Sequence, residues 1–194
     1  MSRNILILPG SARLGSYNRK LASEAMRILS VSDAVVSRID LADYPLPIYD
    51  GDFEADTGVP QNAQLMAQRI AAQDGLLIVS PEYNASIPPL LKNAIDWTSR
   101  VRKVHERPVQ PFKGLVVGLA SASPGRFGGM RGLEAIRLVM RALGAEVMTQ
   151  QCLVPRAAEG FDEDGRLRDD VARTSLEALC DKLLDTARSL SRNA

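Results

Sequence analysis

The chain of 194 residues contains only two cysteines and one histidine. Cys152 and Cys180 stand in stretches that indicate a strand and a helix, without the CxxC or metal-type spacing of redox and zinc motifs. We expect two buried thiols; a disulfide is the alternative, and an intracellular compartment argues against it. Because no second histidine accompanies His105, we expect neither a metal site nor a Ser-His-Asp triad.

The chain also lacks an excess of charge of either sign and any long apolar run. Its 24 basic and 23 acidic side chains nearly cancel, so no nucleic-acid partner is expected. Apolar runs such as 5–8 and 76–79 are far too short to cross a bilayer, and no charged-then-apolar leader opens the chain. We therefore expect a cytoplasmic protein without a membrane partner.

What is present is the composition of an ordinary globular domain. The hydrophobic fraction of 45% and the charged fraction of 24% are typical of such domains, and the length favours one domain over residues 1–194. Strand and helix patterns alternate along it. We expect strands at 5–8, 34–39, 76–80, 115–120 and 147–154, and helices at 18–29, 62–72, 89–100, 133–143 and from about 169.

This alternation predicts the doubly wound, flavodoxin-like α/β fold. Continuous apolar runs such as Ile5-Leu6-Ile7-Leu8 are typical of strands covered on both faces. The plan is a five-stranded parallel sheet of order 2-1-3-4-5, with helices on both faces and a ligand at the carboxyl ends of the strands. Residues 43–60, rich in Pro and Gly, are expected to form a long loop at that end, and residues 158–165 a solvated turn region.

The loop from Gly10 to Asn18 joins the first strand to the first helix, where helix amides and the helix dipole favour an anion. Its residues supply turns and donors: Gly10 and Gly15, the hydroxyls of Ser11 and Ser16, the amide of Asn18 and the guanidinium of Arg13. We expect them to enclose a phosphate. Helix capping is the alternative, but it does not explain Arg13. The P-loop and G-x-G-x-x-G motifs are absent, whereas a monophosphate tail such as that of FMN needs neither.

A second loop, from Pro81 to Pro89, follows the third strand and is expected beside the first. The motifs G-S-x-R-x-x-S-x-N, P-E-Y-N-x-S-x-P and L-K-N-A-I-D-W, in this order, resemble the NADPH-dependent FMN reductase family, which includes quinone, chromate and azo-dye reductases. The likeness runs from Ile5 to about Leu153.

The resemblance implies an FMN site with two groups of residues. Around the phosphate it places Ser11, Arg13, Ser16, Tyr17 and Asn18, with Gly10 at the turn, and along the isoalloxazine ring Pro81, Glu82, Tyr83, Asn84 and Ser86. Independently of the family, backbone amides in a tight turn at Tyr83 and Asn84 suit the carbonyl oxygens and N1 of such a ring. For Tyr83, an exposed aromatic without a ligand is the alternative.

A third loop, from Ser121 to Gly129, ends the fourth strand in small residues. The resemblance implies flavin contacts by Ser121 and Gly125. Three roles stay open for Arg126: binding the nicotinamide cofactor's phosphates, pairing across an oligomer interface, or a solvated loop charge. On the helix after the second loop, Asp96 and Trp97 suit either a cap and core packing or an interface, and the family implies a homodimer or homotetramer.

The chemistry needs no catalytic side chain and no metal, because flavin N5 carries it. We expect NADPH or NADH to transfer hydride to FMN, and a quinone, free flavin, chromate or azo compound then to take the electrons at the same place, by ping-pong kinetics. Two alternatives remain. One is an electron-carrier flavodoxin without nicotinamide activity, although such carriers are typically strongly acidic. The other is a nucleotide- or phosphosugar-binding domain without redox chemistry.

Overall fold

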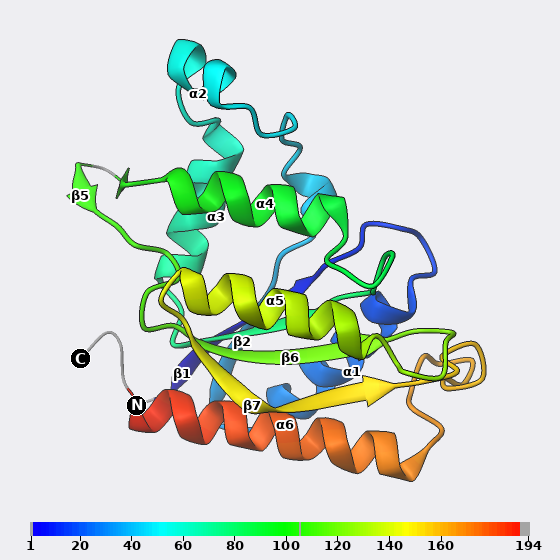
Figure 1. Cartoon of the computed structure of the whole chain (residues 1–194). Coiled ribbons are helices and arrows are strands. Elements are labelled where there is room, and N and C mark those ends of the chain that lie inside the picture. Colours follow the sequence, from blue (N-terminus) through cyan, green and yellow to red (C-terminus); the bar gives the residue numbers. More distant parts are fainter. Residues whose placement is uncertain (1, 105, 191–194) are drawn as a thin grey trace.

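The computed structural model describes residues 2–104 and 106–190 (Figure 1), so the predictions for His105 lie outside the described residues. The larger elements are β1 (Arg3–Pro9), α1 (Tyr17–Ser30), β2 (Ala34–Arg38), α3 (Gln61–Ala71), β3 (Gly75–Val79), α4 (Pro89–Arg100), β6 (Val116–Ala122), α5 (Met130–Ala142), β7 (Glu146–Val154) and α6 (Asp170–Ser189). Each lies within a few residues of an expected strand or helix.

Five strands form one sheet in the order β2-β1-β3-β6-β7, and every neighbouring pair is parallel. The predicted flavodoxin-like order 2-1-3-4-5 is therefore confirmed. Two further strands of two residues each, β4 (Lys103–Val104) and β5 (Arg107–Pro108), form a small antiparallel hairpin that the sequence pattern did not predict.

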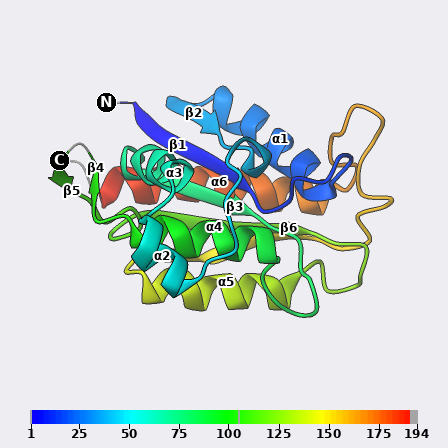
Figure 2. The same ribbon diagram turned by 90° about the horizontal axis from the view of Figure 1, so that it is seen from above.

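Helices cover both faces of the sheet (Figure 2), and the alternation along β1 shows how. Ile5 and Ile7 point into a core closed by α1 and α6, whereas Leu6 and Leu8 point into a second core closed by α3, α4 and α5. Burial on both faces explains why the central strands are continuous apolar runs.

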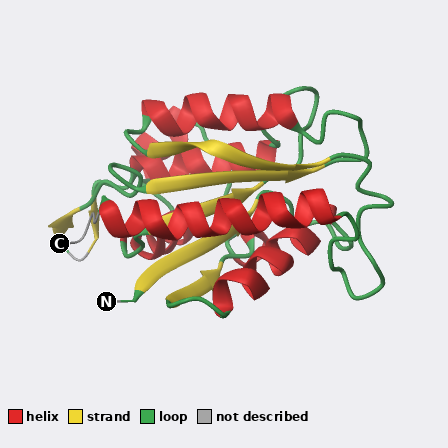
Figure 3. Ribbon diagram, turned by 90° about the horizontal axis from the view of Figure 1, so that it is seen from below, coloured by secondary structure: helices red, strands yellow, loops and turns green. Residues whose placement is uncertain are grey.

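The carboxyl ends of the strands meet at one edge of the sheet, where long loops gather (Figure 3). Strands β1, β3 and β6 are consecutive neighbours, so the loops that follow them are neighbours too. The parallel register thus brings together three segments that lie far apart in the sequence.

The expected loop at 43–60 is partly wrong, because it contains a short helix. A 3-10 turn, η1 (Leu41–Asp43), overlaps its start, and α2 (Gly51–Thr57) lies within it. Asp50 caps α2 by accepting the N–H groups of Asp52 and Phe53, both at 2.9 Å. Since α2 buries none of its residues, it has no apolar period by which the sequence could reveal it. Residues 158–165 form turns, as expected.

Helix α4 holds the 43–60 segment in place. The buried indole of Trp97 donates to the Pro47 carbonyl at 2.8 Å and meets the Tyr49 ring edge to face at 5.0 Å. The Asn93 side chain accepts the Tyr49 N–H at 2.8 Å and donates to Pro47 O at 2.9 Å. Trp97 is therefore a packing residue, whereas Asp96 pairs with Lys92 on the same helix at 2.8 Å.

Cys152 and Cys180 are both buried and free, as expected. Burial raises the pKa of the Cys152 thiol to about 11 and that of Cys180 to about 12. Both are therefore neutral at pH 7 and unsuited to nucleophilic chemistry.

Candidate functional site

The three loops at the carboxyl edge enclose a cleft of about 220 Å³. It is lined by Ser11, Arg13, Ser16, Tyr17, Asn18, Pro81, Glu82, Tyr83, Ala122, Ser123 and Pro124. Eight of these residues were predicted from the sequence as site residues. The structure thus brings the proposed phosphate loop and the proposed ring loop into one cavity.

The phosphate side of the cleft begins at the first turn of α1. Ser16 stands at the N-cap, yet its side chain makes no capping hydrogen bond, and the first turn carries no acidic residue. Ser11 and Ser16 are only 7% and 3% exposed. The first amides of a helix have no partner four residues earlier, and the Ser16 side chain caps none of them here. This first turn therefore lines the cleft together with two sheltered hydroxyls that can donate to an anion.

Arg13 adds the only full positive charge among the residues that line the cleft. Its backbone N–H donates to Ser11 Oγ at 3.3 Å, which holds the loop in a tight turn. Among the described residues its guanidinium makes no hydrogen bond or ion pair, and the residue is exposed. An unpaired guanidinium beside free helix amides is an arrangement that binds a phosphate or another oxyanion.

The side-chain amide of Asn18 is bonded within the protein and is not offered to a ligand. Its side chain donates to Ala122 O at 2.8 Å and accepts the Ala122 N–H at 2.9 Å, and the residue is 2% exposed. Both amide atoms are thus engaged by the end of β6. Asn18 lines the cleft by joining the first loop to the third.

Tyr17 connects the cleft to the 158–165 turn region. Its ring stacks on Phe161, with the centroids 6.3 Å apart and the planes 6° apart. Gly10 serves packing, as the expected turn requires: a Cβ there would lie 2.7 Å from Ser80 Oγ and 3.0 Å from Leu91 Cδ2. A larger residue at position 10 would therefore clash with Ser80 and Leu91.

The second loop is a tight turn. Tyr83 and Ser86 exchange backbone hydrogen bonds of 3.0 and 2.9 Å, and the two residues between them, Asn84 and Ala85, have φ of 50° and 61°. Positive φ at both central positions is the mark of a type I′ turn. The Tyr83 N–H, expected as a donor to the ring, is therefore used inside the turn. The Tyr83 side chain is 47% exposed and lines the cleft, whereas Asn84 and Ser86 are not among the lining residues.

Glu82 anchors this turn to α5. Its carboxylate accepts the Arg131 side chain at 2.6 Å and the Gly132 N–H at 3.1 Å, and it is 9% exposed. Burial opposes ionisation, but the Gly132 amide and Arg131 together outweigh it and lower the pKa of the Glu82 carboxyl. The carboxylate is therefore ionised and turned toward α5, so that Glu82 faces the cleft with its remaining atoms.

The third loop lines the cleft with residues that the sequence did not single out. Ala122, Ser123 and Pro124 line it, whereas the predicted Ser121 and Gly125 flank them. Strand β6 continues to Ala122, beyond its expected end at 120, and this places Ser121 within the sheet. The fully buried Ser121 Oγ has no hydrogen-bond partner among the described residues and lies under Gly129, where a Cβ would approach it to 2.0 Å.

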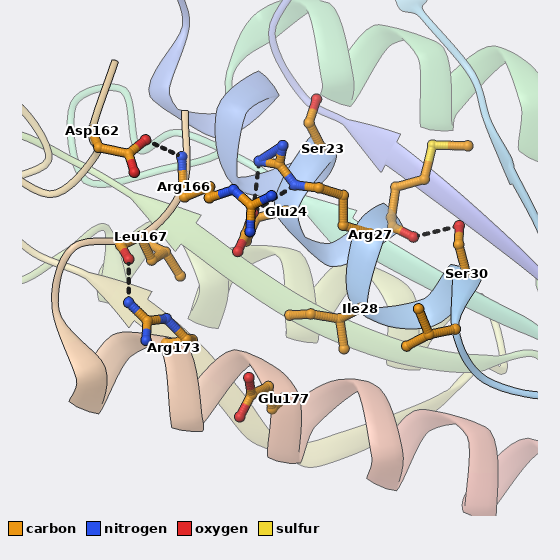
Figure 4. Close-up of a pocket in the computed structure, with 12 residues that line it drawn as sticks. Ser23, Glu24, Arg27, Ile28, Ser30, Asp162, Arg166, Leu167, Arg173 and Glu177 are labelled. Atoms are coloured by element: carbon orange, nitrogen blue, oxygen red, sulfur yellow. Dashed lines mark hydrogen bonds and ion pairs between the residues drawn. The ribbon is translucent and has the colours of Figure 1, made fainter. Parts of the chain in front are cut away.

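A larger cavity of about 890 Å³ lies along α1 and α6 (Figure 4). No predicted site residue lines it. Arg27 pairs with Glu24 at 2.6 Å, and Arg173 donates to Leu167 O at 2.8 Å, so several of its charges are already engaged by the protein. The charged and hydrogen-bonding groups that suit a phosphate are in the smaller cleft instead.

The described residues contain no group of three or more His, Cys, Asp and Glu side chains placed to hold a metal ion. Within the same residues, no helix combines the length and the apolar character that a membrane span requires.

Comparison with known proteins agrees with this geometry. The NADPH-dependent FMN reductase family model matches residues 3–159. An NAD(P)H-dependent FMN reductase of Pseudomonas aeruginosa is 36% identical over 175 residues, which cover 89% of each chain. A quinone reductase of Escherichia coli is 38% identical over 146 residues, covering 75% of this chain and 73% of the relative.

Among solved structures, the NAD(P)H:acceptor oxidoreductase FerB of Paracoccus denitrificans superposes with a TM-score of 0.78 at 26% identity, covering 96% of this chain and 98% of FerB. These relatives are reductases, which does not favour the alternative of an electron-carrier flavodoxin. By the extent of the family match and the identity to these relatives, the chain belongs to the NADPH-dependent FMN reductase family.

Proposed function

We propose that this protein binds FMN in the three-loop cleft and uses it to pass electrons from NAD(P)H to a quinone-type acceptor. The observation that carries the proposal is the uncapped first turn of α1 beside Arg13. The Ser16 side chain caps none of the first amides of the helix, and Arg13 has a guanidinium without a partner among the described residues. Together with the hydroxyls of Ser11 and Ser16, these groups match the three terminal oxygens of a phosphate monoester.

Two of the remaining predicted residues are assigned to the ring. Pro81 and the exposed Tyr83 give the cleft an apolar wall next to the phosphate loop, as a flat isoalloxazine requires. Glu82 holds that wall against α5, and Asn18 holds the phosphate loop against Ala122. Gly10, Asn84, Ser86, Ser121 and Gly125 are retained as supporting positions around the cleft rather than as lining.

FMN held in this cleft would supply hydride chemistry: a hydride from NAD(P)H, which is two electrons and one proton, would pass through it to a quinone, and a second proton from water would complete the hydroquinone. The chain's own residues bind and orient; no side chain in the cleft is required to act as acid or base. Because one open cleft serves both half-reactions, we expect ping-pong kinetics. Free flavin, chromate and azo compounds are further acceptors of the same proposal, and a homodimer or homotetramer is its proposed assembly.

Anaerobic stopped-flow absorbance tests the proposal. Protein loaded with FMN is mixed with NADPH or with NADH, and then with menadione. Loss of the oxidised-flavin absorbance with at least one nicotinamide, and its return with the quinone, is expected. A colourless protein that takes up no FMN, or a bound flavin that neither nicotinamide bleaches, contradicts the proposal; intersecting instead of parallel reciprocal plots contradict the shared cleft.

A further inference from the structure

The loop after β6 carries an exposed cation and an exposed ring directly beyond the cleft. Ser123 and Pro124 line the cleft, and Arg126 and Phe127 follow them. Phe127 is 46% exposed. The base of the loop is held where it turns into α5: a Cβ on Gly128 would lie 3.1 Å from Leu153 Cβ and 3.2 Å from Pro155 N. The two side chains therefore precede a closely packed glycine at the base of the loop.

Two guanidinium groups make cation–π contacts with the Phe127 ring. The Arg126 carbon Cζ lies 4.6 Å from the ring centroid and that of Arg131 lies 5.7 Å from it. Arg131 also pairs with Glu82 at 2.6 Å, so a chain of contacts runs from the ring loop through Arg131 and Phe127 to Arg126. This contact chain ties the Arg126 patch to the loop that carries Tyr83.

The charges of the side chains along these contacts do not balance. Glu82 compensates Arg131, but in residues 2–104 and 106–190 no carboxylate lies within ion-pair distance of Arg126. The contact with the Phe127 ring is made through the face of that ring and uses none of the Arg126 N–H donors in a hydrogen bond, so these donors remain for another partner. Such donors match a carboxylate, a sulfonate or an enolate, and the phenyl ring beside them favours a flat apolar body.

We propose, resting on the proposed function, that Arg126 and Phe127 make the enzyme prefer electron acceptors that are planar rings with one anionic substituent. Uncharged rings of the same size are poorer acceptors. The anionic substituent lies against Arg126 and the ring of the acceptor lies toward Tyr83 and the cleft. This assigns Arg126 to acceptor binding, a role outside the three that the sequence left open for it.

The test compares two naphthoquinones that differ at one ring position, the neutral menadione and the anionic 1,4-naphthoquinone-2-sulfonate. We measure kcat/KM for each acceptor at saturating NAD(P)H. The quantity compared between variants is the ratio of kcat/KM for the sulfonate to kcat/KM for menadione. The variants are Arg126→Gln and, as a matched control, Arg141→Gln, which removes an exposed arginine from the last turn of α5, the helix that follows the loop.

The ratio is expected to fall about threefold to fivefold in Arg126→Gln, as for an exposed ion pair, and to stay at the wild-type value in Arg141→Gln. In the wild type it is expected to fall as salt is raised, because an exposed contact is screened. An unchanged ratio in Arg126→Gln overturns the inference, as does an equal fall in both variants. A raised KM for NADPH with an unchanged ratio assigns Arg126 to the nicotinamide cofactor and also overturns it.

The same measurements separate the two proposals. A wild-type enzyme that reduces menadione but shows no dependence of the ratio on Arg126 leaves the proposed function standing and removes only the acceptor selection. A wild-type enzyme that reduces neither quinone, although its flavin is bound, removes the quinone reductase function and the acceptor selection with it.

Discussion

Asn18 and Ala122, separated by 104 residues in the chain, are joined by a pair of reciprocal hydrogen bonds of 2.8 and 2.9 Å. The pair is buried, and it ties the first turn of α1 to the last residue of β6. A side chain that satisfies both backbone groups of one partner acts as a clamp between two loops of the cleft.

Asn18→Ala is expected to lower the free energy of unfolding by about 1–3 kcal/mol, because it leaves the buried N–H and C=O of Ala122 without partners. Urea denaturation of the apoprotein measures the loss. Asn62→Ala is the control, since it removes one exposed bond to Pro45 O at 2.9 Å and is expected to lose about 1 kcal/mol or less. Equal losses in the two variants would contradict the clamp.

Arg13→Ala is expected to weaken FMN binding by roughly 1.5 to 3 kcal/mol, the loss of a charge-assisted hydrogen bond. Because the Arg13 side chain has no partner among the described residues, the stability of the apoprotein should stay the same. Fluorescence titration of apoprotein with FMN measures the affinity, and Arg141→Ala is the charge-matched control. If FMN binds Arg13→Ala as tightly as the wild type, Arg13 does not contact the phosphate.

Glu82→Gln is expected to lose about 1–3 kcal/mol of unfolding free energy at pH 7, because neutral Gln accepts the Arg131 and Gly132 donors more weakly. The folded-state pKa of Glu82 is lowered, so its stabilisation is fully present above the unfolded value of about 4.3 and is lost as pH falls through the folded value.

The difference in unfolding free energy between wild type and Glu82→Gln should therefore be constant from neutral pH down to about pH 5 and shrink in more acidic solution. Urea denaturation over that range measures it. Asp96→Asn breaks the more exposed pair with Lys92 and is expected to lose well under 1 kcal/mol. A difference that grows on acidification would contradict the assigned sign.

Trp97→Phe is expected to lower the free energy of unfolding by about 1 kcal/mol or more, since the bond from the indole to Pro47 O disappears and a cavity remains. Limited proteolysis should then cut within 43–60 faster than in the wild type. Ser30→Ala, which removes a hydroxyl bonded to Met26 O at 2.6 Å, is the control for a lost polar contact outside the 43–60 segment. Unchanged cleavage in Trp97→Phe would show that the segment is held by other contacts.

The fold and two of the three loops could be predicted from local patterns. Apolar runs indicate buried strands. A phosphate-binding loop is indicated by the types and spacing of Gly10, Ser11, Arg13 and Ser16. The partner of Asn18 could not be predicted, because Ala122 is distant in sequence and contributes only backbone. Ser121 was expected to contact the flavin because of the family resemblance, but the strand continues two residues beyond its expected end and places Ser121 in the sheet. Helix α2 buries nothing and so leaves no apolar pattern.

The cleft draws its residues from the loops after β1, β3 and β6, and none from β7 or α6. During synthesis, every cleft residue is therefore present once Pro124 has been added. The α6 residues that complete the core under β1 and β3 are synthesised later; they include Leu176, Leu179 and Leu183. Because that core is open until α6 docks, the clamp between Asn18 and Ala122 cannot be held rigidly before then. Cofactor capture should consequently follow the docking of α6 rather than precede it.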